Sequence, residues 1–221
     1  LGEGRRIFDN VRRSMSYILA VHVPIAGMAI LPVAFGAPTV LFPVHMALLE
    51  FVIDPACALV FEAEPAAADA MTRKPRDVSA PLFGKRDMLR AAGDGLAGLV
   101  SVAAVDIFAR GAMAENEPAA RATTFAAIVS ANLALILIFR GSEADVSTAL
   151  RGMTPILKRV LGLALLGLGL ALYVPPLAGL LKFSGPGPVA LAAGLLGGAA
   201  GPVLLELLRR SVRLIRAKNG R

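Results

Sequence analysis

Two carboxylates lie four residues apart inside an apolar segment, where acidic side chains are rare. The segment LLEFVIDPAC contains Glu50 and Asp54, which project from the same face if the segment is a helix. A charged side chain at the centre of a membrane-spanning helix costs at least about 2.5–3.5 kcal/mol, and two carboxylates on one face repel each other. The pair therefore predicts a site for a cation or a proton, with a protonated, hydrogen-bonded structural pair as the alternative.

A histidine lies at a comparable depth in the preceding apolar segment. His22 is part of AVHVPIAG, and a turn expected at residues 36–38 would place the two segments side by side and antiparallel. We therefore expect the imidazole to face the carboxylates. Glu50, Asp54 and His22 are the predicted cation-binding residues and metal ligands, and a core histidine with satisfied hydrogen bonds is the alternative for His22.

A proline lies close to each part of this predicted site. Pro24 and Pro55 lack a backbone N–H, and each ring clashes with the carbonyl four residues earlier, at Ala20 and Phe51. Inside a membrane a released carbonyl must find a partner, and a bound cation is a suitable one. We predict that both prolines are helix-breaking and that the released carbonyls contribute to the cation site.

Further polar residues lie in or near apolar segments. Asn132 is a possible ligand, with a hydrogen bond between helices as the alternative. His45 is a second possible ligand, although its place near one end of its segment favours the membrane interface. Asp106 and Arg110 are four residues apart and are predicted to pair with each other, and Asp94 is predicted to lie at the cytoplasmic interface.

Long apolar segments separated by charged ones indicate a membrane protein with several spans. Of the 221 residues, 56% are hydrophobic and 18% are charged, and the mean hydropathy is +0.68. A helix needs about 20 apolar residues to cross about 30 Å of hydrocarbon. The predicted fold class is therefore all-α, a six-helix transmembrane bundle with short loops. The predicted spans are 14–35, 39–61, 91–113, 121–139, 156–178 and 187–208.

The positive charges indicate how the spans are oriented. All lysines and arginines except Arg110, Arg121 and Lys182 fall on one side of the predicted bundle, and the side with the excess is cytoplasmic. Both termini are therefore expected in the cytoplasm. Because the cations occupy the gaps between apolar segments and do not gather on one folded face, we expect no nucleic-acid partner.

The last predicted span contains glycines four residues apart, Gly194 with Gly198 and Gly197 with Gly201. Small residues at this spacing allow helix backbones to approach closely. Packing inside the bundle is the predicted role, and a dimer interface is the alternative.

Three motifs in residues 2–83 resemble P-type cation-transporting ATPases of the calcium-pump-like branch. GEGRRIFDNVRRSMSYILAVHV resembles their stalk and fifth membrane helix, with the pattern G-R-x-I-x-x-N. LFPVHMALLEFVIDPACALVFEAEP is similar to their sixth helix, and DAMTRKPRDVSAPLF resembles the following loop, with its M-x-R-x-P-R signature. The other four spans resemble the family's C-terminal four-helix bundle in number and in RATTFAAIVSANLALILIFR. The resemblance thus covers the C-terminal half of the transmembrane domain, the fifth to tenth membrane helices.

The resemblance implies roles for individual residues. Asp54 falls on the sixth-helix aspartate that contacts the ion, Glu50 on an asparagine of calcium pumps, and His22 on a fifth-helix asparagine. Ile25 falls where calcium pumps have a glutamate, and Asn132 falls near a ligand position of the eighth helix. Oxygen ligands suit Ca²⁺, whereas an imidazole beside carboxylates also suits Mn²⁺, Zn²⁺ or a proton. A divalent cation such as Ca²⁺ or Mn²⁺ is the expected cargo.

The resemblance also implies partners and a division of the chain. The pump's D-K-T-G, T-G-E and G-D-G-x-N-D motifs do not occur in these residues, so the chain is not expected to hydrolyse ATP alone. ATP and Mg²⁺ would bind in missing domains, and the expected partners are the lipid bilayer, the missing N-terminal part of the same pump and the transported cation. The expected parts are a cytoplasmic stalk end (1–13), an ion-site helix pair (14–62), a cytoplasmic loop (63–90), a supporting four-helix bundle (91–210) and a basic cytoplasmic tail (211–221).

The implied function is the membrane-embedded part of an ATP-driven cation pump. One alternative is an ion- or proton-coupled secondary transporter with Glu50, Asp54 and His22 as a proton relay. Another is a membrane assembly subunit whose buried charges pair with a partner helix. We expect an integral membrane protein that is a piece of a longer protein, and the Ala-, Gly- and Arg-rich composition favours the bacterial cytoplasmic membrane.

Overall fold

The structure is a computed structural model that describes residues 2–66, 71–72, 81–140 and 153–219, without the side chains of residues 52–58 and 217–219. The described residues form helices and no strands. The helices are α1 (Gly2–Ala34), α2 (Pro43–Glu62), α3 (Lys85–Ala112), α4 (Glu117–Arg140), α6 (Pro155–Tyr173), α7 (Pro175–Leu180) and α8 (Pro188–Asn219).

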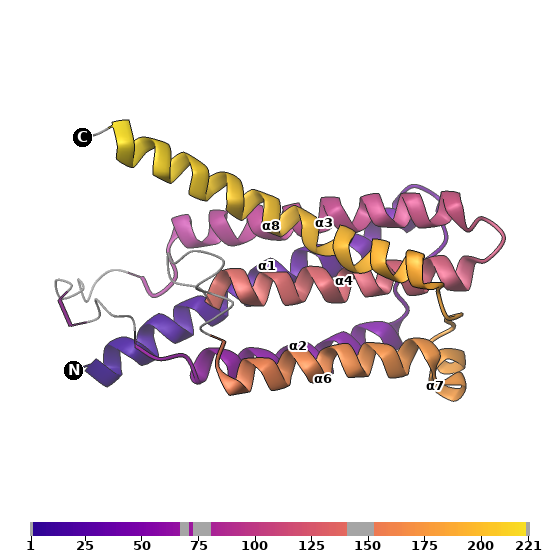
Figure 1. The fold of residues 1–221 in the computed structure, drawn as a ribbon, viewed down its shortest axis with the longest axis horizontal. Helices are drawn as coiled ribbons and strands as arrows, with labels where there is room; N and C mark the ends of the chain where they lie inside the picture. The colour runs from indigo at the N-terminus through magenta and orange to yellow at the C-terminus, as the bar shows by residue number, and fades with distance from the viewer. Residues whose placement is uncertain (1, 67–70, 73–80, 141–152, 220–221) are drawn as a thin grey trace.

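Each predicted span overlaps a helix of the structure, and a helical membrane bundle is confirmed. By length and composition, α1, α3, α4, α6 and α8 are each able to cross a membrane. The remaining predicted span, 39–61, corresponds to α2, which has 20 residues, and part of its side chains lies outside the described part of the chain. In Figure 1 both termini lie at the same end of the bundle, as an even number of crossings requires.

The ends of the helices follow from local chemistry. Gly36 has a φ of 69° in the turn between α1 and α2, a backbone conformation that glycine adopts without strain. The first turn of α3 is capped by Asp87, whose Oδ2 accepts the Gly84 N–H at 3.1 Å. The predicted fifth span is divided, because two consecutive prolines begin the short helix α7 at Pro175 after α6 has ended at Tyr173. A run of apolar residues continues across this break, which is why hydropathy did not predict it.

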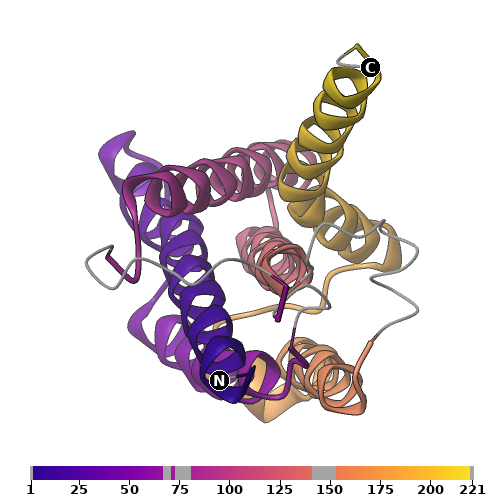
Figure 2. The same cartoon turned by 90° about the vertical axis from the view of Figure 1, so that its left-hand side faces the viewer.

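Helix α4 occupies the centre of the bundle. Figure 2 shows it surrounded by α1, α2, α3, α6 and α8, and it packs against all five. In the most apolar 18-residue segment of α4, 83% of the residues are buried inside the bundle, whereas the corresponding share in the other candidate spans is 17–39%. Alanines and threonines dominate its first half, and such small side chains allow neighbours to approach from every side.

Helix α1 contacts both groups of helices expected from the sequence, the ion-site helix pair (14–62) and the supporting four-helix bundle (91–210). It packs against α2 as predicted, but more extensively against α3, and it also contacts α4. The predicted stalk end and first span form one helix of 33 residues, which is about 50 Å long at 1.5 Å per residue. Helix α1 therefore connects its N-terminal end to helices of both groups.

Neither proline of the predicted site breaks its helix, so this prediction is wrong. Pro24 is buried within α1, and the backbone of α2 remains helical through Pro55. A proline in a helix interior removes one backbone donor, and both helices nevertheless continue past it. The carbonyl oxygen of Ala20, which Pro24 releases, faces α3, where a Cβ added to Gly95 would lie 2.5 Å from it. This carbonyl is covered by a neighbouring helix.

The glycines of α8 serve packing inside the chain. A Cβ at Gly194 would lie 2.7 Å from the Thr123 oxygen of α4, and one at Gly198 would overlap the Ala127 oxygen of the same helix. Gly197 faces Val105 of α3, and Gly201 also faces α3. Each glycine pair therefore accommodates a different neighbouring helix, as the bundle-packing prediction requires.

Replacing Gly198 by alanine is expected to destabilise the bundle. The new methyl group would meet backbone atoms of α4, which cannot move aside as a flexible side chain can. Overpacking of this kind costs about 1–3 kcal/mol. Thermal unfolding of the purified protein in detergent would measure a lower Tm. The matched control is Gly169→Ala on α6, where no atom lies within 4 Å of the added Cβ. Equal Tm values for the two variants would contradict the prediction.

Candidate functional site

Two of the three predicted cation ligands lie on the outer faces of α1 and α2. The side chains of Glu50 and His22 are both exposed, and His22 Nδ1 lies 2.7 Å from the Ile18 carbonyl oxygen of its own helix. The Asp54 side chain lies outside the described side chains, so the geometry of the predicted triad is not described. Among the described side chains, no group of three His, Cys, Asp or Glu residues is placed to hold a metal ion.

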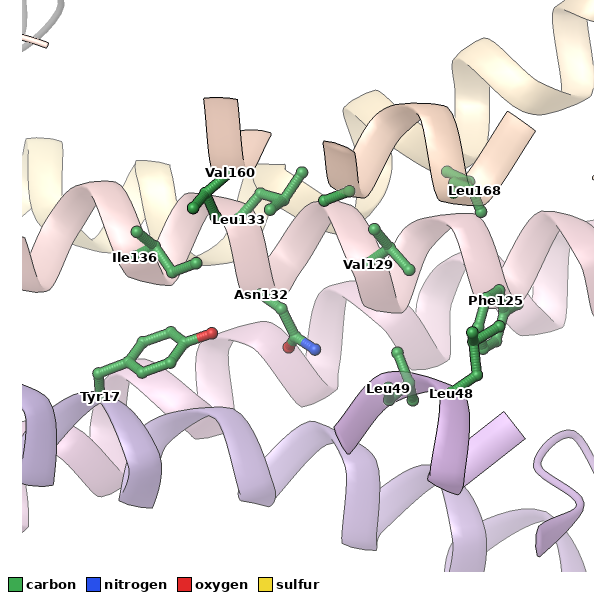
Figure 3. A pocket seen from close by; sticks show the side chains of 12 residues that line it. Tyr17, Leu48, Leu49, Phe125, Val129, Asn132, Leu133, Ile136, Val160 and Leu168 are labelled. Carbon is green, nitrogen blue, oxygen red and sulfur yellow. The ribbon is translucent and has the colours of Figure 1, made fainter. Parts of the chain in front are cut away.

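Asn132 lies at the heart of the bundle. Its side chain is on the central helix α4 and is 3% exposed, and neither amide atom has a hydrogen-bond partner in the described part of the chain. It borders a cavity of about 50 Å³ that α1, α2, α4 and α6 line together. In Figure 3 its amide and the Tyr17 hydroxyl point into the same space.

This amide and the Tyr17 hydroxyl are the polar groups of the cavity wall. The rest of the wall is almost wholly apolar, with Leu49 of α2, Phe125 of α4 and Leu168 of α6 among its side chains. A buried amide without partners costs about 1–3 kcal/mol, so a site of this kind favours an occupant with polar atoms. The predicted hydrogen bond from Asn132 to another helix is absent among the described residues.

His45 is a structural histidine, and its possible role as a ligand is not supported. Its ring is completely buried inside the protein, in the first turn of α2. Nδ1 accepts the Phe42 N–H at 3.1 Å, Nε2 donates to the Leu181 carbonyl at 2.7 Å, and the ring stacks on Phe183 at 4.7 Å. Both nitrogens are therefore used, one to cap α2 and one to hold the loop that precedes α8.

The predicted pair of Asp106 and Arg110 is confirmed. Arg110 Nε lies 2.8 Å from Asp106 Oδ2 and its Nη2 donates to the Pro38 carbonyl at 2.8 Å. The second carboxylate oxygen of Asp106 accepts the Thr124 hydroxyl at 2.9 Å. The pair thus connects α3 to α4 and to the loop between α1 and α2.

Arg121, which the sequence had not singled out, has a similar role at the same end of the bundle. This buried arginine pairs with Glu117 one turn earlier. It also donates to the carbonyls of Thr39, at 3.3 Å, and Lys182, at 3.0 Å. The spacing of Glu117 and Arg121 could have indicated the pair, but not the two distant carbonyls.

Comparison with known families gives the chain its context. The family model described as "Cation transporting ATPase, C-terminus" matches residues 38–211, which includes every helix from α2 to α7 and most of α8. The chain belongs to this family. It is therefore the membrane part of a larger cation-transporting ATPase, embedded in the bilayer and accompanied by other parts of the pump, and the resemblance to P-type pumps is confirmed at this level. No curated protein matches the chain.

The N-terminal turns of α1 are fixed to the body of this pump region by polar contacts. Arg12 holds Asp87 of α3 with two bonds, at 2.9 and 2.6 Å. Asn10 Nδ2 donates to the Glu64 carbonyl at 3.1 Å, and the buried Glu64 carboxylate pairs with Arg140 at the end of α4. The end of α1 is thus connected to the termini of α2, α3 and α4.

A second polar group of the pump region joins α3 to α8, and we call it the α3–α8 charge cluster. Asp94 pairs with Arg209 and is 0% exposed, because its partner on α8 allows the carboxylate to be buried inside the protein. Glu206 is 5% exposed, and its Oε1 lies 2.9 Å from Arg210 Nε. The complete cluster is Arg90, Asp94, Glu206, Arg209, Arg210 and Arg213.

Proposed function

We propose that this chain forms part of the cation-binding and translocation pathway of an ATP-driven pump, with Glu50, Asp54 and His22 as ligands of the transported ion. The observation that supports this most strongly is the position of Glu50. Its carboxylate lies exposed on an apolar helix of a chain that belongs to a family of cation-transporting ATPases. A charge in this position needs a partner other than lipid, and a cation together with the remaining helices of the pump would be that partner.

The central cavity supports the same proposal. Asn132 offers an amide oxygen without a partner in the described chain at the meeting point of α1, α2 and α4. Two of these helices carry the proposed ligands, so a rearrangement of α1 would alter the site and the cavity together. We propose Asn132 as an additional polar group of the pathway.

The ligand set favours a divalent cation such as Ca²⁺ or Mn²⁺. Carboxylate oxygens suit both ions, and an imidazole among them favours Mn²⁺ over Ca²⁺. ATP and Mg²⁺ would bind in domains outside this chain, and the contacts of Arg12 and Asn10 would transmit the movement of those domains to the helices. A bacterial cytoplasmic membrane is the proposed location.

ATP-driven uptake by the full-length pump in sealed vesicles tests this function. We expect uptake of Ca²⁺ or Mn²⁺ that requires ATP and persists after the membrane potential and proton gradient are collapsed. Uptake that follows an imposed ion or proton gradient and ignores ATP would instead identify a secondary transporter. Absence of transport for Ca²⁺, Mn²⁺, Zn²⁺ and Mg²⁺ would contradict the proposed cargo.

A further inference from the structure

The C-terminal end of α8 extends beyond the bundle. The helix has 32 residues and is therefore about 48 Å long, which exceeds the roughly 30 Å of a hydrocarbon core. Figure 1 shows its last turns passing the ends of the neighbouring helices and diverging from them. We call residues 209–219 the α8 arm.

The described part of the arm has a basic face and an apolar face. At 3.6 residues per turn, the guanidinium groups of Arg213 and Arg216 fall on one side. Leu214 and Ile215 fall on the other side and are 72% and 59% exposed, whereas Val212, which is 46% exposed, lies at the edge beside Arg216. The sequence contains no acidic residue after Glu206, so the arm is positively charged along its whole length.

The apolar face of the arm continues the outer face of the membrane span. Leu204 and Leu208 are 58% and 64% exposed, and the helical period aligns them with Ile215, which is two turns further along. Between them Ser211 hydrogen-bonds the Leu207 carbonyl of its own helix at 3.0 Å, so it adds no unsatisfied polar group to this stripe. One stripe that begins on the span and continues into the arm indicates a single neighbour for both, which is the lipid.

We propose that the α8 arm binds the anionic headgroups of phospholipids in the leaflet from which it emerges. The arginines would contact the phosphate groups, while Leu214 and Ile215 would lie at the boundary with the acyl chains. Helices with one basic and one apolar face bind membrane surfaces in this way, and clustered arginines and lysines next to a membrane span attract anionic lipids.

The base of the arm connects this surface to the rest of the pump region. Arg213 also lies 3.1 Å from the nearly buried Glu206, and Arg209 pairs with Asp94 of α3. The first turn of α3 in turn holds Arg12 of α1 through Asp87. A headgroup that competes with Glu206 for Arg213 would disturb the α3–α8 charge cluster, in which Arg90 of α3 also faces Glu206. Because α3 packs against α1, anionic lipid is expected to influence transport as well as binding.

Quenching of a fluorophore by brominated lipids tests the proposal on the full-length pump in liposomes. The fluorophore is attached to Leu214→Cys in a pump without other cysteines. At equal mole fractions, brominated phosphatidylglycerol is expected to quench about threefold more than brominated phosphatidylcholine. The difference should disappear in Arg213→Gln/Arg216→Gln and decrease at high salt, which screens the attraction.

Two further variants separate charge from structure. Arg213→Lys/Arg216→Lys keeps the positive charges and should keep the lipid preference, whereas a purely structural role of the arginines would not be rescued. Lys158→Gln/Arg159→Gln removes two exposed charges at the start of α6 and should leave the preference at Leu214 unchanged.

The possible negative results have clear meanings. Equal quenching by the two lipids would refute headgroup selectivity, and no quenching by either would place the arm in water or against a soluble domain of the pump. Because the measurement needs neither ATP nor a transported ion, its failure would leave the proposed transport function untouched.

Discussion

Full-length pump with Asp54→Asn is expected to lose at least about tenfold in apparent affinity for its cation, a change of about 1.4 kcal/mol. The substitution preserves the shape of the side chain but removes one of two charges that are four residues apart on α2. With only Glu50 left, the proposed site would neutralise a divalent ion less completely. ATP-driven uptake measured against cation concentration gives the affinity directly.

A matched carboxylate far from the proposed site provides the control. Glu117→Gln removes a charge at the other end of the membrane bundle, where Glu117 pairs with Arg121 and its side chain is 46% exposed. Arg121 retains its bonds to two carbonyl groups there, so we expect folding and cation affinity to be preserved. Unchanged affinity in Asp54→Asn as well would remove Asp54 from the site.

The membrane helices could be predicted from the sequence because span length and the distribution of charge are local properties. The predicted span 121–139 differs from α4 by four residues at its start and one at its end. The central position of α4 was not predicted, because hydropathy measures whether a helix avoids water but not whether lipid or protein surrounds it. The sequence feature that could have indicated this position is its many small residues, with Thr123 and Thr124 buried among alanines, because a helix surrounded by protein needs small side chains.

Pairing inside the bundle could be predicted only over short distances in the chain. Asp106 and Arg110 form the expected pair because they lie one turn apart on one helix. Arg209, the nearer cation to Asp94, and Leu181, whose carbonyl accepts from His45, are 115 and 136 residues away from them, and no spacing rule connects these groups. A buried polar residue therefore suggests a ligand site until its distant partner is known, as His45 illustrates.

The proposed ligands show the same limit for residues that are exposed, because their surroundings also depend on distant parts of the protein. Glu50 and His22 are exposed on the described chain, and we propose that other helices of the pump cover them and supply further partners. The sequence still indicates such positions, because a charged side chain in an apolar membrane helix has an unfavourable free energy of insertion. Local spacing identified the pair of acidic residues, but the arrangement of the ligands depends on helices that pack against them.

The buried ion pair of Arg140 and Glu64 is expected to be the most sensitive structural contact at the stalk end of the pump region. Both side chains are at least nine-tenths buried, and Arg140→Met would leave the Glu64 carboxylate without its nearest cation. Loss of one partner from a buried pair typically costs about 3–5 kcal/mol. We therefore expect a marked decrease in Tm, measured by thermal unfolding in detergent.

A second substitution distinguishes lost charge pairing from lost packing. Arg140→Met/Glu64→Gln removes both charges, and because the remaining amide is far easier to bury than an unpaired carboxylate, most of the lost stability should return. Arg159→Met, at an exposed arginine of α6, controls for the loss of a positive charge and should leave the Tm unchanged. If the double variant were as unstable as Arg140→Met, the arginine would act through packing. The connection from Asn10 through the Glu64 backbone would then not depend on the ion pair.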